Sequence, residues 1–241
     1  SSWVGVATSD LSMNSFDINM ETGNIYFDNN KIRINSSSTD ADQGNNAIAI
    51  GNNTATSFQG QNSIAIGNDA GSINQSSSFG NGIAIGTSSA NFNQGTNGIA
   101  IGASAGRNSQ GQGSIAIGLN SGNTGQQTFS TAIGLQAGFQ NLGANSVAIG
   151  YNASINGSLL PNIVVINGSG AAVNPVVGNS TYIKPIRNND TLSNIMLYNT
   201  STGELVYSDT VNGNLNIQGD LGVTGDIDMC CNFINDICGI F

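Results

Sequence analysis

A repeat of 16 residues runs through the middle of the chain, and it constrains the fold more than any other feature of the sequence. Each copy carries a short alternating motif that ends in glycine, as in residues 47–51 and 146–150. Five of the six spacings between the closing glycines are 16 residues and one is 19, which indicates a three-residue insertion near residues 76–78. A repeat of this length predicts a solenoid in which every copy forms one coil and stacks on its neighbours.

Alternation within the motif places its two isoleucines on one face of a strand and Ser, Ala and Gly on the other. One such strand cannot bury its isoleucine pair alone, whereas stacked coils would align the pairs into ladders along a continuous core. The predicted core residues are Ile48, Ile50, Ile64, Ile66, Ile83, Ile85, Ile99, Ile101, Ile115, Ile117, Ile133, Val147 and Ile149. The predicted turns of the repeat are the closing glycines Gly51, Gly67, Gly86, Gly102, Gly118, Gly134 and Gly150.

The composition predicts an almost wholly β chain. Asn (37 residues) and Gly (33 residues) disfavour helix interiors but adopt the left-handed backbone angles of tight corners.

The absence of histidine excludes a Ser-His-Asp triad and a His-ligated metal. Five Lys and Arg against 14 Asp and Glu give a net charge of -9, which argues against a nucleic-acid partner. The longest apolar runs have about five residues, too few to insert into a bilayer.

Residues 102–106 fit the G-x-S-x-G pattern of hydrolase nucleophiles, but that pattern needs a strand–turn–helix context and a histidine partner. It also falls in phase with the repeat, so a solenoid corner is the favoured interpretation. Asp69 is the only acid between residues 46 and 155, and glycan hydrolysis there would need two carboxylates. The sequence therefore predicts no catalytic or cofactor-binding site and no enzymatic activity.

Three further sets of residues have both a plain and a functional interpretation. The cysteines near the C-terminus are expected to be small buried residues of a shaft, with interchain disulfides as the alternative. The aspartates nearby are expected to be solvated rather than to bind an axial cation, so no metal site is predicted. The phenylalanines of the repeat are expected to plug corners, with glycan stacking as the alternative. These sets are Cys230, Cys231 and Cys238; Asp220, Asp226 and Asp228; and Phe58, Phe92, Phe129 and Phe139.

The repeat motif resembles the head repeats of trimeric autotransporter adhesins of the YadA type. The family motif is close to N-S-V-A-I-G followed by x-x-A/S, and residues 145–150 with Ala153 match it directly. The resemblance covers roughly residues 44–155 and implies a left-handed parallel β-roll that forms a homotrimer. This chain departs from the usual 14-residue period by two residues per coil, so a longer loop is expected at one corner.

The flanks differ from the repeat. Residues 162–168 are expected to form a last, more apolar strand that caps the roll, and residues 196–208 predict a β-hairpin around Thr202 and Gly203. Residues 182–208 resemble a segment of fibre-like proteins of large DNA viruses, and residues 215–229 resemble β-prism or β-helix shafts of viral tail fibres. The predicted division is an N-terminal shaft or hairpin segment at 1–45, the roll at 46–158, the capping strand and hairpin at 159–210, and the start of a C-terminal shaft at 211–241.

These features predict a structural protein of a virion surface: a homotrimeric fibre, spike or capsid-associated protein that presents an attachment surface. Its expected partners are its own copies, other virion proteins, and a host surface glycan or protein. The head domain of a bacterial trimeric adhesin, displayed on a bacterial cell surface, is the alternative, and a glycan-degrading tail spike is a remote one. The sequence leaves open which receptor is bound and which residues, if any, come after Phe241.

Overall fold

The computed structural model describes residues 32–34, 43–76, 79–156, 159–186 and 195–208, and all regular structure within these residues is β. The chain divides into two compact units, residues 1–186 and residues 187–241, which are considered separately. The expectation of an all-β chain is therefore confirmed for the described residues. Among them, no helix is long and apolar enough to cross a membrane.

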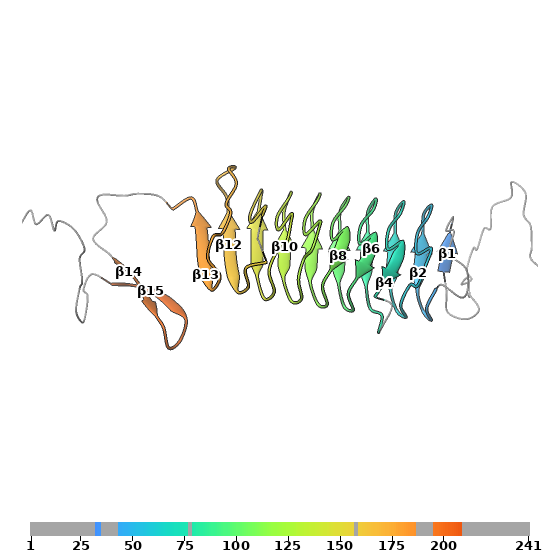
Figure 1. The fold of residues 1–241 in the computed structure, drawn as a ribbon, viewed down its shortest axis with the longest axis horizontal. Coiled ribbons are helices and arrows are strands. Elements are labelled where there is room, and N and C mark those ends of the chain that lie inside the picture. The colour runs from blue at the N-terminus through green and yellow to red at the C-terminus, as the bar shows by residue number, and fades with distance from the viewer. Residues whose placement is uncertain (1–31, 35–42, 77–78, 157–158, 187–194, 209–241) are drawn as a thin grey trace, which may run out of the picture. The chain divides into compact units, whose positions relative to one another are not determined.

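The first unit is built around a ten-stranded parallel sheet whose strands stack side by side along the solenoid (Figure 1). Neighbouring strands pair at equivalent positions of the repeat, so that Ile48 pairs with Ile64 and Ile99 with Ile115. The strands, in order, are β1 (Ile32–Ile34), β2 (Ile48–Ile50), β3 (Ile64–Ile66), β5 (Ile83–Ile85), β7 (Ile99–Ile101), β9 (Ile115–Ile117), β10 (Thr131–Ile133), β11 (Val147–Gly150), β12 (Ile163–Asn167) and β13 (Ser180–Lys184).

A second, shorter sheet forms the other wall of the coils. It consists of β4 (Ile73–Gln75), β6 (Phe92–Gln94) and β8 (Asn108–Gln110), which also pair in parallel. Isolated parallel bridges extend this wall in both directions, from Gln43 with Gln59 to Gln140 with Asn156. The predicted solenoid of stacked coils is thus confirmed, with two walls of backbone enclosing a thin interior.

The pairing register locates the three-residue insertion. Ile64 pairs with Ile83 and Gln75 with Gln94, so both steps span 19 residues instead of 16. The preceding step still spans 16 residues, since Gln59 and Gln75 are neighbours in adjacent coils: Gln59 Nε2 donates to Gln75 Oε1 at 3.1 Å. The extra residues therefore lie between Gln75 and Ile83, where the spacing of the glycines predicts them.

The solenoid is longer than the predicted roll of residues 46–158. Strand β12, expected to cap the roll, pairs with β11 on one side and with β13 on the other. At the opposite end, β1 joins the sheet from within the segment predicted as a separate shaft or hairpin. The repeat motif is lost at both ends, but backbone pairing needs only a strand of the right length and direction, so the sheet continues beyond the recognisable pattern.

The predicted hairpin is confirmed in the second unit. Strand β14 (Ile195–Asn199) pairs antiparallel with β15 (Glu204–Ser208), and Gly203 in the turn has a φ of 74°. Asn199 Oδ1 accepts a hydrogen bond from the backbone nitrogen of Ser201 at 2.9 Å, which closes the turn. The predicted C-terminal shaft, with its cysteines and aspartates, and most of the predicted N-terminal segment lie outside the described residues.

The prediction of an isoleucine core is wrong, because the alanine between the two isoleucines is the residue that points inward. Ala49, Ala65, Ala84, Ala100, Ala116, Ala132 and Ala148 are all completely buried. None of the residues predicted as core is buried: Ile48, Ile50, Ile64, Ile66, Ile83, Ile85, Ile99, Ile101, Ile115, Ile117, Ile133, Val147 and Ile149 lie on the outer side of the sheet.

The reason is the thinness of the coil. A Cβ atom added to Gly106 would lie 3.2 Å from Cβ of Ala100, and one added to Gly138 would lie 3.1 Å from Cβ of Ala132. These glycines belong to the wall that faces the alanines, so at the alanine position of these coils there is room for a methyl group but not for isoleucine. The interior is wider at the C-terminal end of the solenoid, where Leu142, Ile163 and Val165 are fully buried. The predicted alternation of the motif is therefore present, but its buried and exposed faces are exchanged relative to the prediction.

A buried row of glutamines, which the predicted core does not include, fills the rest of the interior. From Gln59 onward each lies eleven residues after the first isoleucine of its motif, and its Nε2 donates to that isoleucine's carbonyl, as in Gln110 to Ile99 at 2.8 Å. Gln43 Nε2 donates to the carbonyl of Ala47. Neighbouring glutamines also bond to each other, as in Gln94 to Gln110 at 3.1 Å. The signal in the sequence is a glutamine at a constant place in the repeat: Gln43, Gln59, Gln75, Gln94, Gln110 and Gln126.

The glycines predicted as turns occupy the end of the strand motif in each coil, where the backbone has φ between 107° and 130°. At Gly102 an added Cβ would lie 2.8 Å from the carbonyl carbon of Gly118 in the next coil. Other corners use left-handed angles that asparagine also adopts, such as Asn62 at 54° and Asn97 at 58°. The abundance of Gly and Asn is therefore a consequence of the coil geometry.

Replacing the inward Ala116 by leucine is expected to destabilise the solenoid by about 1–3 kcal/mol, because the thin interior would be overpacked. The matched control is Ala103→Leu, at an exposed position where the next two coils carry Leu119 and Leu135. That variant is expected to change the free energy of unfolding by less than about 0.5 kcal/mol. Urea unfolding followed by circular dichroism measures both, and equal losses in the two variants would contradict the inward position of alanine.

Replacing Gln110 by leucine is expected to cost about 1–3 kcal/mol, because buried carbonyl groups would lose their hydrogen-bond donor. Leu142 occupies the same place in a later coil and is fully buried, so the variant is expected to fold. Gln112→Leu is the control, since Gln112 is exposed and its side chain makes no hydrogen bond with the described residues. Unfolding midpoints that do not differ between the two variants would show that the glutamine row adds no stability.

Candidate self-association interface

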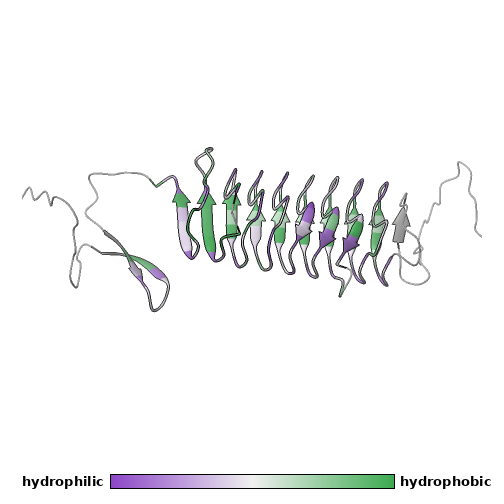
Figure 2. Cartoon of the chain, viewed as in Figure 1, coloured by the Kyte–Doolittle hydropathy of each residue, from purple (hydrophilic) through white to green (hydrophobic). Residues whose placement is uncertain are grey.

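The outward isoleucines form two parallel rows on the large sheet, and these rows are called the isoleucine face. The second row is continuous along nine paired strands, and its last six members are 36–43% exposed. In Figure 2 the hydrophobic colouring is strongest on β12, whereas β13 is largely pale. The second row consists of Ile50, Ile66, Ile85, Ile101, Ile117, Ile133, Ile149, Ile166 and Ile183, and the first of Ile48, Ile64, Ile83, Ile99, Ile115, Thr131, Val147, Val164 and Thr181.

The isoleucine face widens toward the C-terminal end of the solenoid. Leu119, Leu135 and Tyr151 lie two residues beyond the second row, across the turn glycine, and are 49%, 41% and 43% exposed. In earlier coils the same place holds Asn52, Asn68, Thr87 and Ala103. An exposed apolar strip of this kind is typical of surfaces that contact another molecule.

A row of asparagines borders the face on its other side. Asn46 Nδ2 donates to Asn62 Oδ1 at 3.0 Å, and Asn162 Nδ2 donates to Asn179 Oδ1 at 2.8 Å. Asn145 continues this row by donating to Asn162 at 3.4 Å. A ladder of hydrogen-bonded amides is thus present at both ends of the solenoid, and it gives the apolar strip a polar, uncharged margin.

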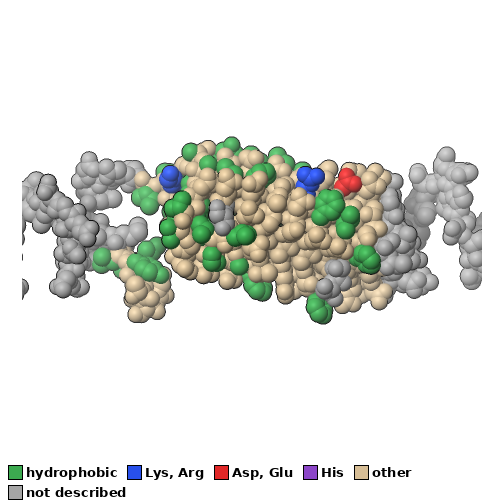
Figure 3. All heavy atoms as spheres, in the orientation of Figure 1, with side chains coloured by type: hydrophobic (Ala, Val, Ile, Leu, Met, Phe, Trp, Pro, Cys, Tyr) green, Lys and Arg blue, Asp and Glu red, His purple; other side chains and the backbone are tan. Residues whose placement is uncertain are grey.

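The isoleucine face carries no charged side chain among the described residues. The charged side chains that the structure describes are few: Asp69, Arg107, Lys184 and Glu204. Figure 3 shows how sparse such groups are on one side of the molecule.

The pKa of Tyr182 lies below its ordinary value because of a side-chain hydrogen bond with Ser180 and because the backbone nitrogens of Val176 and Val177 donate to the phenol oxygen. These contacts fix the loop before β13.

The G-x-S-x-G match lies in a solenoid corner of the described residues. Ser104, at the centre of the G-x-S-x-G match, occupies a corner with a φ of 55°, and its backbone nitrogen donates to the carbonyl of Thr87. The strand–turn–helix context of a hydrolase nucleophile is not formed there. No group of three or more His, Cys, Asp or Glu that could hold a metal occurs among the described residues.

The phenylalanines expected to plug corners point outward instead. Phe58 and Phe129 are both 61% exposed, and Phe92 is 39% exposed. Phe139 is half-buried. The side chains buried in these coils are mainly alanine, serine and glutamine, which leave no room for an aromatic ring, and the corner-plug prediction is wrong for the three exposed rings.

Comparison with known families gives one match. The family model described as the YadA head domain repeat matches the chain in two copies, at residues 43–70 and 142–154. No curated protein and no solved structure gives a significant match to the chain. The matched residues lie within the stacked coils, and the second match contains the motif at residues 145–150 that carries the resemblance. The matches and the stack of 16-residue coils together fit a YadA-like head repeat region.

Proposed function

We propose that the solenoid is the rod of a homotrimeric surface fibre and that the isoleucine face is the contact between its three chains. The observation that carries this proposal is the pair of outward isoleucine rows, which leaves an apolar strip without cover in the single chain. The family match supports it, since YadA-type heads are adhesin heads that form trimers. Three such faces turned toward a common axis would bury all the strips at once.

The repeat favours a parallel, in-register assembly. Every coil presents the same residues at the same height, so chains that run in the same direction would bring equivalent isoleucines together at each level. Ten strands stacked about 4.8 Å apart give a rod roughly 45 Å long. The left-handed roll implied by the YadA resemblance belongs to this proposal. A rod of this kind acts by presentation: it holds an attachment surface away from the body that carries it.

The carrier that we propose is a virion. Residues 182–208, which resemble a segment of viral fibre-like proteins, include β14 and β15, the hairpin of the second unit. The second candidate is the head of a bacterial trimeric adhesin on a cell surface, and the match to the YadA head repeat favours it. In both cases the chain acts without catalysis, in keeping with the single acid, Asp69, between residues 46 and 155.

The isoleucine face can be tested with Ile117→Asp. The wild-type protein is expected to have the mass of a trimer, and the variant that of a monomer, because association would bring three desolvated carboxylates together. Gln140→Asp is the control, since Gln140 is exposed on the opposite wall. Native mass spectrometry or sedimentation measures all three proteins. A monomeric wild type, or a variant that stays trimeric, would contradict the proposed interface.

The carrier can be tested by immunoelectron microscopy with antibodies raised against residues 43–186. Gold particles on projections from intact virions are expected. Labelling of projections on bacterial cells would instead support the second candidate. Labelling confined to the interior of cells or particles would contradict a surface fibre of either kind.

A further inference from the structure

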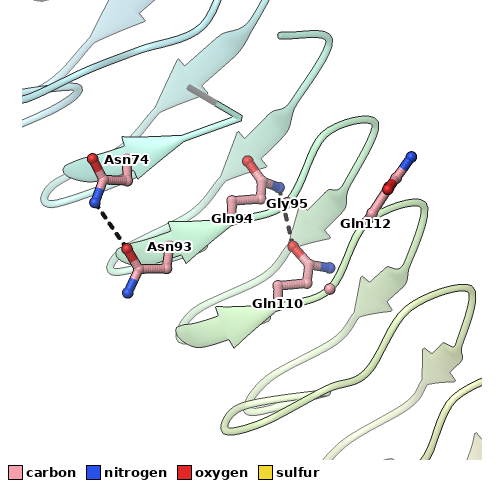
Figure 4. Close-up of a pocket in the computed structure, with 7 residues that line it drawn as sticks. Asn74, Asn93, Gln94, Gly95, Gln110 and Gln112 are labelled. Carbon is pink, nitrogen blue, oxygen red and sulfur yellow. Dashed lines mark hydrogen bonds between the residues drawn. The ribbon is translucent and has the colours of Figure 1, made fainter. Parts of the chain in front are cut away.

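A groove of about 380 Å³ lies beside the three-residue insertion, on the wall opposite the isoleucine face. Asn74 and Asn93 lie on one side of it and Gln112 on the other, as Figure 4 shows. Gln94 Nε2 donates inward to the carbonyl of Ile83 at 2.9 Å, so the groove and the isoleucine face lie on opposite sides of the coil. A trimer formed through the isoleucine face would leave the groove open to solvent.

We propose that this groove binds a neutral oligosaccharide. The inference rests on the proposed attachment function, since it names the chemical class that one face of the rod would recognise. Three independent features of the groove carry it: unused amide groups, exposed aromatic rings, and a local departure from the repeat.

The amides of the groove have free hydrogen-bonding groups of both kinds. Asn74 Nδ2 donates to Asn93 Oδ1 at 2.9 Å, which leaves Asn74 Oδ1 and Asn93 Nδ2 without a partner among the described residues. The exposed amide of Gln112 is likewise unused by them. An amide offers an acceptor and two donors, the combination that hydroxyl groups need. No charged residue lines the groove, so it has no preference for an ionic ligand.

Two exposed phenylalanines border these amides. Phe58 neighbours Asn74 in the adjacent coil, because Ser57 pairs with Ile73 and Gln59 bonds to Gln75 on either side of it. Phe92 directly precedes Asn93 in β6 and pairs with Ile73. Phe58 is 61% exposed and Phe92 is 39% exposed. A sugar ring has an apolar C–H face and a hydroxyl rim, so it can stack on such a ring and bond to the amides beside it.

The aromatic residues gather where the repeat is broken. The place of Phe58 is taken by Gly125 and Asn141 in later coils, and that of Phe92 by Thr124 and Gln140. Phe79, on the insertion itself, is 73% exposed. Because the other coils form without aromatic residues at these places, the solenoid does not need them, and the position of Phe58 and Phe92 beside Asn74 and Asn93 points to a ligand.

The test uses purified wild-type trimer on an array of neutral oligosaccharides, with sialylated and sulfated sugars as separate arms. Binding to a neutral oligosaccharide is expected, and Phe58→Asn and Phe92→Asn are each expected to weaken it at least tenfold. Asparagine stands at these two places in the following coils, as Asn74 and Asn108, so both variants are expected to fold. Phe139→Asn is the control, since Phe139 lies two coils beyond Arg107, its carbonyl accepts a hydrogen bond from Thr124 rather than from any groove-lining residue, and asparagine stands at its place in the preceding coil as Asn123.

Retained sugar binding by Phe139→Asn, together with its loss in Phe58→Asn and Phe92→Asn, would support the site. The inference is overturned if the trimer binds no neutral sugar, if only the acidic sugars bind, or if the control loses binding as strongly as Phe58→Asn. It is also overturned if the trimer binds glycosidase-treated target cells as well as untreated cells, since the partner is then a protein. Native mass measured on the same samples separates the two proposals, because a trimer without sugar binding contradicts only this inference, whereas a monomeric wild type contradicts the proposed fibre.

Discussion

The thinness of the coil interior is the constraint on which the rest of the structure depends. The two walls lie so close that a glutamine on one of them reaches the carbonyl groups of the other, as in Gln75 to Ile64 at 2.7 Å. Between the walls there is room for the methyl group of alanine, and Ala65, Ala84 and Ala100 are buried without any exposed surface. The larger isoleucines must therefore face outward, and a solenoid with this interior carries its apolar surface on the outside.

The same constraint explains why the interior is partly polar. Two layers of backbone leave carbonyl groups facing the inside of the coil, and buried carbonyl groups need donors. The glutamine row supplies these donors and links one coil to the next. At the insertion the row is interrupted: no bond joins Gln75 to Gln94 among the described residues, and Gln94 Oε1 is buried without a partner. Gln59 Oε1, in a coil of regular length, is also buried without a partner, so an unpaired amide oxygen is not confined to the irregular coil.

The two walls of the solenoid have different surfaces, and the proposed roles follow this difference. The large sheet presents aliphatic rows without charge, which suit a contact with identical chains in register. The wall of β4, β6 and β8 is irregular, with aromatic and amide side chains that vary from coil to coil. A surface that must fit its own copies is held constant by the repeat, whereas a surface for a ligand needs local variation. The position of Phe58 and Phe92 on the variable wall agrees with that division.

The sequence by itself determined the period, the turn glycines, the all-β character, the site of the insertion and the hairpin at β14 and β15. These depend on spacing and on local backbone preferences, which are properties of short segments. Only the tertiary structure decided which side of the alternating strand is buried, because alternation defines two faces without saying how far apart the walls lie. It also decided that β12 and β13 continue the sheet, since pairing depends on the neighbouring strand and not on the motif. The isoleucine face and the groove could not be predicted from the sequence for the same reason: both depend on residues that become neighbours only when the coils stack.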